Sequence, residues 1–182
     1  MLTVKERGQF VATMRYVHVQ LMETLAAWVP TTPEMEVKLL FGEHIWDVAQ
    51  HADALGKRTF ELRLPLQHSV RPAEGYVELL ADVAALGPTP ERIAALYDVL
   101  VPALLARYRQ HLDRSDALLD APTVRIVERW VADTTRMTSD ARALREELPA
   151  LRLAEAGWAE ALRAREAATE LLATPETATV EA

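Results

Sequence analysis

Apolar residues recur at spacings of three and four along four long stretches of the chain, and this pattern limits the fold more than any other feature. The first two stretches have it at Val11, Met14, His18, Leu21, Leu25 and Trp28, and at Val37, Phe41, His44, Val48, His51, Leu55 and Leu62. The later two have it at Ile93, Tyr97, Leu100, Leu104 and Tyr108, and at Val124, Val127, Val131 and Thr134. Such spacing places one apolar stripe along each helix. The sequence therefore predicts an all-α antiparallel bundle.

Prolines and capping residues divide the chain into its predicted helices. We expect helices over residues 3–29, 33–64, 73–86, 90–118, 122–147 and 150–173. Four of them form the bundle and the others are additional helices. All lie in one domain, residues 1–174, followed by a frayed tail over residues 175–182. Pro102 falls inside the fourth long helix, where it predicts a kink or a bulge.

Charge and composition exclude several classes of function. The net charge of −7 argues against nucleic acid as a partner, because proteins that bind phosphate backbones concentrate lysine and arginine. The absence of cysteine excludes disulfides, thiolate metal sites and cysteine nucleophiles. No apolar run reaches the roughly 20 residues of a membrane span, and the N-terminus lacks the apolar segment of a signal peptide. We expect a cytoplasmic protein with no membrane partner.

Three histidines fall on the predicted apolar stripes, where a polar side chain needs a partner inside the bundle. His18 lies on the first helix, and His44 and His51 lie on the second. Inward polar groups on facing helices are how bundles build metal and cofactor sites. His44 and His51 are about 10.5 Å apart along a helix, so they do not share one ion. Asp47 lies between them and shares a face with either one.

These residues support two interpretations, which the sequence leaves open. In the first, Glu23, Asp47 and His51 are candidate ligands of a metal, or His18, His44, Asp47, His51 and Tyr97 are candidate acid/base groups around a bound molecule. In the second, the histidines form a structural polar layer, because a buried imidazole needs only one or two hydrogen-bond partners.

Two segments of the sequence resemble a known family. "HIWDVAQHADAL" and "DAPTVRIVERWVAD" are the most specific parts of a likeness that covers about residues 10 to 140. They resemble the ferritin-like superfamily, in a branch of bacterial proteins akin to tRNA-hydroxylase-type bundles. The resemblance implies a four-helix bundle that holds two irons by a glutamate from each of two helices and a Glu-x-x-His pair from each of the other two.

The sequence departs from that iron-binding pattern at three positions. His51 is present, but Val48 stands where the glutamate three residues earlier is expected. In the fifth predicted helix the corresponding pair falls near Thr134 and Met137, which are poor ligands for iron. We therefore expect a degenerate site that holds a single iron or manganese, or none.

The resemblance and the histidines together give three hypotheses for function. The first is an enzyme that binds and modifies a small organic molecule, in a bacterial biosynthetic pathway, with a reduced or absent metal site. The second is a non-catalytic helical binding or interaction protein whose polar core is structural. The third is an iron-dependent oxygenase with an atypical site. The last helix has a stripe at Leu151, Ala154, Trp158, Leu162 and Ala168. We expect this stripe to pack on the bundle, with a homodimer interface as the alternative.

Overall fold

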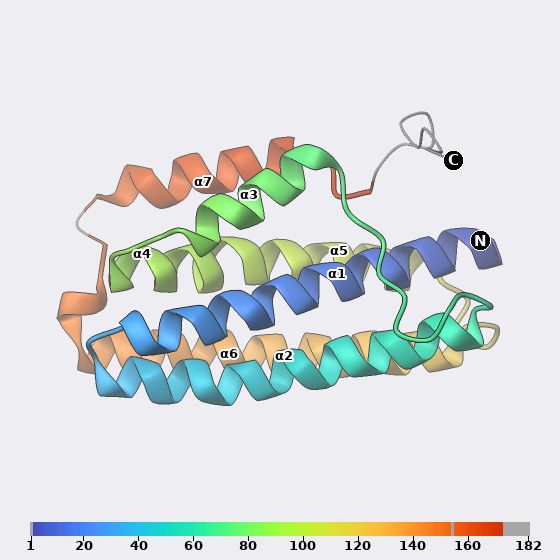
Figure 1. Cartoon of the computed structure of the whole chain (residues 1–182), viewed down its shortest axis with the longest axis horizontal. Coiled ribbons are helices and arrows are strands. Elements are labelled where there is room, and N and C mark those ends of the chain that lie inside the picture. Colours follow the sequence, from blue (N-terminus) through green and yellow to red (C-terminus); the bar gives the residue numbers. More distant parts are fainter. Residues whose placement is uncertain (1, 154, 173–182) are drawn as a thin grey trace.

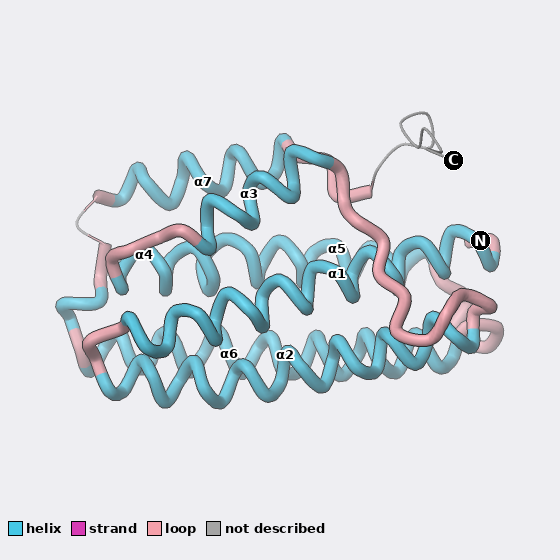
Figure 2. Tube along the Cα trace, in the orientation of Figure 1, coloured by secondary structure: helices cyan, strands magenta, loops and turns pink. Residues whose placement is uncertain are grey.

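A computed structural model describes residues 2–153 and 155–172, and within these ranges the chain forms helices and no strand (Figures 1 and 2). The helices are α1 Val4–Trp28, α2 Met35–Glu61, α3 Glu74–Ala84, α4 Thr89–Ala94, α5 Val101–Arg114, α6 Ala121–Glu147 and α7 Ala156–Ala168. Short turns of 3₁₀-helix occupy Val29–Thr31 and Pro149–Leu151, and a π-helical segment occupies Ala95–Leu100. The predicted all-α class is confirmed. The predicted tail, residues 175–182, lies outside the described residues.

Four long helical rods run alongside one another: α1, α2, α6 and the continuous run from α4 to α5. The ribbon colours in Figure 1 give their directions. α2 returns antiparallel to α1, and α6 returns antiparallel to α5. α5 runs parallel to α2, because the segment over residues 62–88, which includes α3, brings the chain back along the length of the bundle. α3 contacts α1, and α7 contacts the π-helical segment, so both lie on the outside of the four rods.

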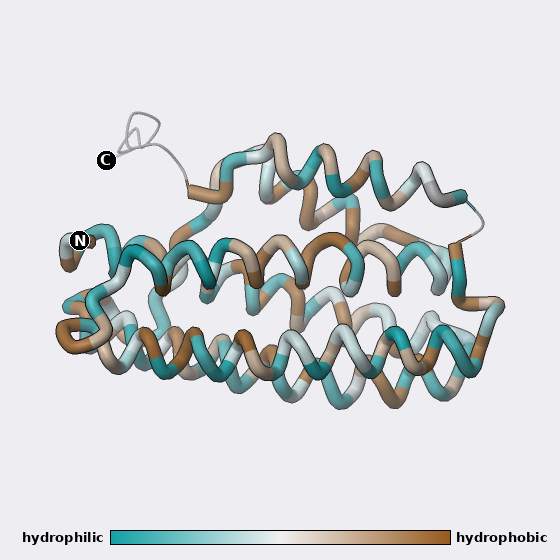
Figure 3. Tube along the Cα trace, turned by 180° about the vertical axis from the view of Figure 1, so that it is seen from behind, coloured by the Kyte–Doolittle hydropathy of each residue, from teal (hydrophilic) through white to brown (hydrophobic). Residues whose placement is uncertain are grey.

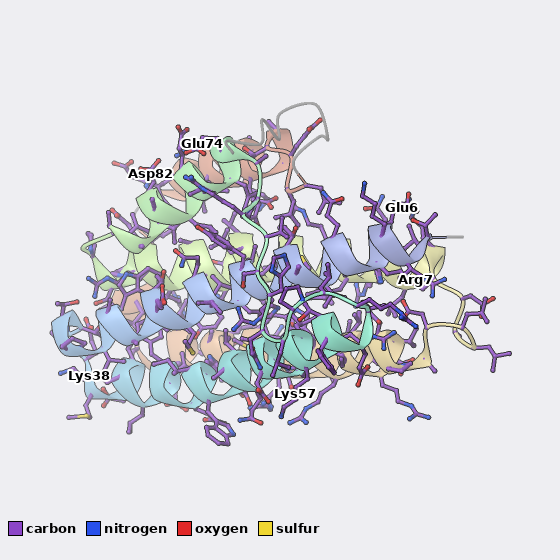
Figure 4. All side chains as sticks on the ribbon, turned by 45° about the vertical axis from the view of Figure 1, so that its right-hand side comes forward. Glu6, Arg7, Lys38, Lys57, Glu74 and Asp82 are labelled. Carbon is purple, nitrogen blue, oxygen red and sulfur yellow. The ribbon has the colours of Figure 1, made fainter. Side chains whose placement is uncertain are left out.

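The apolar stripes pack together in the core, as the spacing predicts for α1 and α2. Hydrophobic and polar positions alternate along each rod (Figure 3). Val11, Met14, Phe41 and Val48 are among the buried residues. Lys38 and Lys57 lie on the outer side of α2, away from this core (Figure 4).

The stripe of α6 matches the prediction at Val127 and Thr134 and differs at its other positions. Its buried residues are Thr123, Val127, Trp130, Thr134, Met137 and Ala141. Val124 and Val131, which the prediction placed inward, are only partly buried. Trp130 precedes the predicted position 131 by one residue, which is a rotation of about 100° around the helix. Trp130 is therefore the residue that lies in the centre of the bundle.

The bulge predicted around Pro102 is confirmed. Residues 95–100 form a π-helical segment that ends two residues before this proline. Proline has no N–H to donate and its ring crowds the preceding turn, so the hydrogen-bond ladder widens there. Such segments are frequent at functional sites. Tyr97, one of the candidate residues, lies inside it and is fully buried.

Several predicted helix ends are wrong by a few residues. α2 begins at Met35, whereas residue 33 was predicted, because Thr32 turns inward and donates a hydrogen bond to the Trp28 carbonyl at 2.9 Å. The predicted helix over residues 90–118 ends at Arg114. The predicted helix over residues 150–173 is a 3₁₀ turn followed by α7.

The last helix packs against the rest of the molecule. Leu151 is buried, and Trp158 and Leu162 pack against the core, whereas Ala168 is exposed. Ala154, the remaining member of the predicted stripe, lies outside the described residues. The homodimer through this stripe stays a prediction. Within the described residues, no helix combines the length and the apolar composition that crossing a membrane requires.

The connection after α2 packs closely against α2 at Gly56, where the Gln67 N–H donates a hydrogen bond to the Gly56 carbonyl at 3.0 Å. Arg63 and Gln67 have positive φ angles of 66° and 58°. Gln67 accepts a hydrogen bond from Arg15 at 2.9 Å and donates one to Asp53 at 3.1 Å. A Cβ at position 56 would lie 1.9 Å from the Gln67 side-chain oxygen, so Gly56 leaves room for these bonds.

Candidate functional site

The structure buries all three histidines of the predicted stripes. His18 and His44 are 0% exposed and His51 is 2% exposed. The rings of His18, on α1, and His51, on α2, have their centroids 5.9 Å apart. His44 lies about 10.5 Å further along α2 and contacts Tyr97 instead. The histidines therefore form two polar centres in the bundle.

The first centre is a hydrogen-bonded pair of His51 and Asp133, on the neighbouring helices α2 and α6. The Nε2 atom of His51 lies 2.7 Å from the Oδ2 atom of Asp133. An ionised carboxylate only accepts hydrogen bonds, so Nε2 carries the hydrogen and Nδ1 keeps its lone pair. No other hydrogen bond joins the His51 ring to a described residue. Asp133 thus holds Nε2 of His51, and the lone pair of Nδ1 can accept a proton.

Burial and the carboxylate act on His51 in opposite directions. Burial lowers the pKa of His51 below its ordinary value, and the hydrogen bond and charge of Asp133 partly raise it again. The imidazole is therefore neutral at pH 7, which is the state that a general base requires.

Aromatic rings surround this pair and fix its orientation. Trp130 presents ring contacts to His18 at 4.2 Å and to His51 at 4.6 Å, both close to perpendicular. His18 Nε2 lies 2.8 Å from the Tyr108 hydroxyl. Burial, with the neighbouring His51, lowers the pKa of His18 well below its ordinary value, and burial raises the pKa of Tyr108. His18 and Tyr108 therefore stay neutral beside His51.

A pocket of about 170 Å³ opens on the surface over His51, between α2 and α6. Its lining residues are Gln50, His51, Ala54, Arg125, Ile126 and Arg129. The Arg129 side chain is 69% exposed and its Nε lies 3.7 Å from the Asp133 carboxylate. Arg125 is exposed and forms no ion pair with a described residue. The pocket thus has an imidazole at its base and two guanidinium groups at its rim.

The second centre joins His44 to Tyr97 and Asp140. The His44 Nδ1 atom lies 2.6 Å from the Tyr97 hydroxyl, and Nε2 lies 3.7 Å from the Asp140 carboxylate. Burial raises the pKa of Tyr97 well above its ordinary value, so the hydroxyl keeps its proton. Burial lowers the pKa of His44, while Asp140 and Asp47 act to raise it.

Two predicted metal ligands lie elsewhere. Glu23 is exposed on α1, where it accepts a hydrogen bond from Gln20 at 3.0 Å. Asp47 accepts a hydrogen bond from Arg136 at 2.8 Å. Within the described ranges, no three histidine or carboxylate side chains are placed to hold one metal ion. Glu23, Asp47 and His51 therefore do not form the predicted site.

The centre of the bundle also does not fit the pair of irons that the family resemblance implies. Val48, Thr134 and Met137 are all buried at the positions where iron ligands are expected. The Thr134 hydroxyl has no hydrogen-bond partner among the described residues. A hydroxyl, a thioether and an isopropyl group are poor ligands for iron. These residues therefore do not fit a pair of irons.

Asp133 and Asp140 are the functional candidates that sequence reasoning missed. They are seven residues apart on α6, as His44 and His51 are on α2. On antiparallel helices, one register pairs His51 with Asp133 and His44 with Asp140. The matching spacing of two histidines and two aspartates was the signal that could have found both pairs.

Comparisons with known proteins give no relative from which a role could be transferred. No family model matches the sequence, and neither the search of curated proteins nor the search of solved structures finds a match. The function is therefore inferred from the side chains and their geometry.

Proposed function

We propose that this chain is an enzyme that binds a small anionic organic molecule over His51 and transfers a proton with that imidazole. The observation that carries the proposal is the 2.7 Å bond between His51 and Asp133 at the base of a pocket. Arg125 and Arg129 at the rim supply positive charge for the anionic part of the ligand.

The proposed chemistry needs only groups of this chain. His51 Nδ1 takes a proton from the bound molecule, and Asp133 stabilises the imidazolium that forms. Asp133 also fixes the tautomer, because its carboxylate accepts the Nε2 hydrogen. Trp130 and His18 hold the ring in place from inside the bundle. Because proton abstraction requires neutral His51, activity rises with pH through the lowered pKa of His51.

A ferritin-like fold is part of this proposal. Its support is the order of the four rods, in which α2 and α5 run parallel and are joined by a long crossover over residues 62–88. One long crossover of this kind distinguishes ferritin-like bundles from bundles with short loops throughout. In this reading the pocket at His51 works without a metal pair.

The alternative is a non-catalytic protein whose polar core is structural. The observation that favours it is the close packing beside His51, where the rings of His18, Tyr108 and Trp130 contact one another at 4.2–6.0 Å. A ligand then has access only to the shallow pocket outside this packing. Failure to bind an anion at this pocket would favour the structural role, because the proposed enzyme requires a bound anionic molecule there.

Replacing Asp133 with asparagine is expected to lower the pKa of His51 further. The substitution removes the charge that raises this pKa, while the burial that lowers it remains. Titration of the histidine ring signals by NMR measures the change. Asp140→Asn serves as the matched control, because it removes the carboxylate next to His44 and leaves the His51 pair intact. An unchanged titration of His51 in the Asp133→Asn protein would contradict the proposed pair.

Inorganic phosphate, used as an anionic probe, is expected to shift the ring signals of His51. Arg125→Gln should weaken this binding about fivefold, which corresponds to about 1 kcal/mol for an exposed charge contact. Arg142→Gln removes an equal charge from another exposed position of α6 and should change the affinity by less than about twofold. Phosphate that leaves His51 unperturbed, or equal losses in both variants, would exclude the anion site.

A further inference from the structure

The outer face of α2 carries apolar side chains that the rest of the described chain leaves uncovered. Met35 is 61% exposed, Leu39 68% and Trp46 67%. They are four and seven residues apart, so they lie on one stripe of the helix. This stripe is on the outer side of α2, where Lys38 and Lys57 also lie (Figure 4). Large apolar side chains that gather on one exposed face, and are not scattered singly, mark an interaction surface.

Gly42 lies on the same stripe and is a second sign that another helix approaches it. A Cβ atom at position 42 would meet no atom of the described residues within 4 Å. The packing of a single chain therefore does not require glycine here. Glycine inside a helix is less stable than alanine, but it allows the backbone of another molecule to come close. Its presence thus fits a second helix packed on the stripe.

Charged residues flank the stripe in an order that suits a second copy of the same helix. At about 100° per residue, Glu36 and Lys57 lie on one side of the direction of Trp46. Lys38 and Asp53 lie on the other side. Each side therefore has one acidic and one basic residue, which are in opposite halves of the helix. In an antiparallel pair the two halves exchange places, so that acid meets base.

A twofold axis at Trp46 brings these opposite charges to the same level. In such a pair, a residue a given number of positions before Trp46 faces the residue equally far after Trp46 in the second copy. Glu36 is ten positions before Trp46 and Lys57 is eleven after it. Lys38 is eight positions before Trp46 and Asp53 is seven after it. The rotation also brings each side of the helix onto the same side of the second copy, so both charge pairs form, and each forms twice.

The same register places small residues against each other beside the axis. Gly42 is four positions before Trp46, and Ala49 is three positions after it, on the same side of the helix. Because neither has a bulky side chain, the two helices can approach closely at this level. The two Trp46 rings then meet at the axis, where an exposed aromatic ring gains the most from burial.

The charged side chains are available for contacts with a second copy. Glu36 and Lys38 form no ion pair with a described residue. Lys57 and Asp53 pair with each other within the chain at 2.6 Å, but their side chains are 68% and 47% exposed. A carboxylate has two oxygens and an ammonium group three hydrogens, so both can make a further contact across the interface.

We propose that the chain forms a homodimer in which the outer face of α2 packs antiparallel against the same face of a second copy, with Trp46 at the twofold axis. The contact extends about 34 Å along each helix and is about 11 Å wide. An interface of this size is at the lower end of specific complexes, so the dimer dissociates on dilution. It does not use the stripe of the last helix and does not depend on the function proposed for the pocket at His51.

Sedimentation equilibrium of the full chain at about 1 to 200 µM tests the proposal. A reversible equilibrium between monomer and dimer is expected, with a dissociation constant in the micromolar range. Trp46→Ala should weaken the dimer at least about tenfold, because tryptophans at the centre of an interface carry much of the binding energy. A chain that stays monomeric over this whole range would overturn the proposal.

Leu118→Ala is the control for the loss of an exposed apolar side chain. Leu118 is 87% exposed and lies on the connection between α5 and α6, outside α2. Its truncation should change the dissociation constant by less than about twofold. Trp46 and Leu118 are both exposed in the single chain, so neither substitution removes core packing, and circular dichroism checks that both variants fold. Equal losses in the two variants would contradict an interface on α2.

An exchange of charges tests the register. In Glu36→Lys and in Lys57→Glu, like charges meet at two symmetric contacts, and each variant should form the dimer about tenfold more weakly. The chain that carries both substitutions has opposite charges at these contacts again, and its affinity should return to within about threefold of the original. Single variants that bind as the original chain does, or a double variant without recovery, would overturn the antiparallel pairing at Trp46.

A lipid surface is the other occupant that an exposed stripe with lysines could have. Flotation with vesicles of phosphatidylcholine and phosphatidylglycerol distinguishes it from a second copy. The original chain should not bind these vesicles in a way that depends on Trp46. Vesicle binding that Trp46→Ala abolishes, in a chain that does not self-associate, would assign the stripe to a membrane surface and overturn the proposal.

Discussion

Replacing Asp120 with alanine is expected to lower the free energy of unfolding by about 3–5 kcal/mol, because it removes the buried counter-charge of Arg58 and leaves only the exposed Glu61 beside this buried arginine. Asp120 is 0% exposed and accepts a hydrogen bond from Arg58 Nη2 at 2.7 Å. It also accepts one from the Thr123 hydroxyl at 2.7 Å. Arg7 lies 3.8 Å from its other oxygen.

The size of this effect follows from what the substitution leaves behind. Arg58 is buried and also donates to Thr123 at 2.8 Å, so it has little freedom to move into water. Asp120 stands at the beginning of α6 and contacts Arg58, which lies near the C-terminal end of α2. It also contacts Arg7, near the beginning of α1 (Figure 4). Its loss therefore loosens three helices at one end of the bundle.

Urea unfolding at pH 7 measures the change, and Glu61→Ala provides the control. Glu61 is the other carboxylate that contacts Arg58, at 2.6 Å, but its side chain is 54% exposed. Truncating it should cost less than about 1 kcal/mol, as is typical of exposed ion pairs. Similar losses in the two variants would show that burial of Asp120 is not the cause.

Asp120 also illustrates which level of structure the sequence predicts. Its position before Pro122 predicts a capping residue, and it does stand at the N-cap of α6. Its side chain makes no capping bond, because it turns inward to Arg58. Capping signals are local in the sequence, whereas Arg58 is 62 residues away. The helix boundary was therefore predictable, and the role of the side chain was not.

The same distinction explains the outcome for the candidate site. The spacing of apolar residues predicted that His18, His44 and His51 face inward, because burial depends on one helix at a time. Their partners Asp133 and Asp140 depend on how α6 lies against α2. The metal site with Glu23 was predicted without knowing how α6 lies against α2.

The register also decides which polar groups stay exposed. Asp47 lies between the two histidines on α2, yet it reaches Arg136 at the surface and not the bundle centre. Arg136 also contacts Glu43 and Asp133, so it lies beside the His51 pair at the surface. Charge pairs of this kind form only after the helices have packed, which is why composition alone could not place them.

Lowering the pH from 6.5 to 4 is expected to reduce the free energy of unfolding by several kcal/mol, because buried neutral histidines must then be protonated. Burial lowers the pKa of His111 from 6.5 to about 4, despite the nearby charge of Asp120, which raises it. The pKa values of His18, His44 and His51 are also lowered by burial. Between the ordinary pKa of 6.5, which applies in the unfolded chain, and the lowered pKa of the folded chain, the unfolded chain binds more protons than the folded chain.

The lowered histidine pKa values determine the pH range in which stability is lost. The stabilisation is fully present above pH 6.5, declines as the pH falls, and for His111 is exhausted below about pH 4. A difference of about 2.5 pKa units corresponds to about 3 kcal/mol from His111 alone. Urea unfolding at pH 7, 5.5 and 4.5 measures the decline.

Substitution of His111 separates its contribution from those of the other histidines. His111 stacks on Phe10 with ring centroids 3.8 Å apart, so His111→Phe keeps a flat ring in that place and removes the titrating group. Between pH 6.5 and 4, the free energy of unfolding of this variant should fall by about 3 kcal/mol less than that of the original chain. His68→Phe, at a half-buried position, serves as the control. Asp120 and His111 are also coupled: because Asp120 raises the pKa of His111, Asp120→Ala should lower this pKa further and steepen the loss of stability in acid. An unchanged pH dependence in both His111→Phe and Asp120→Ala would exclude His111 as a source of acid instability.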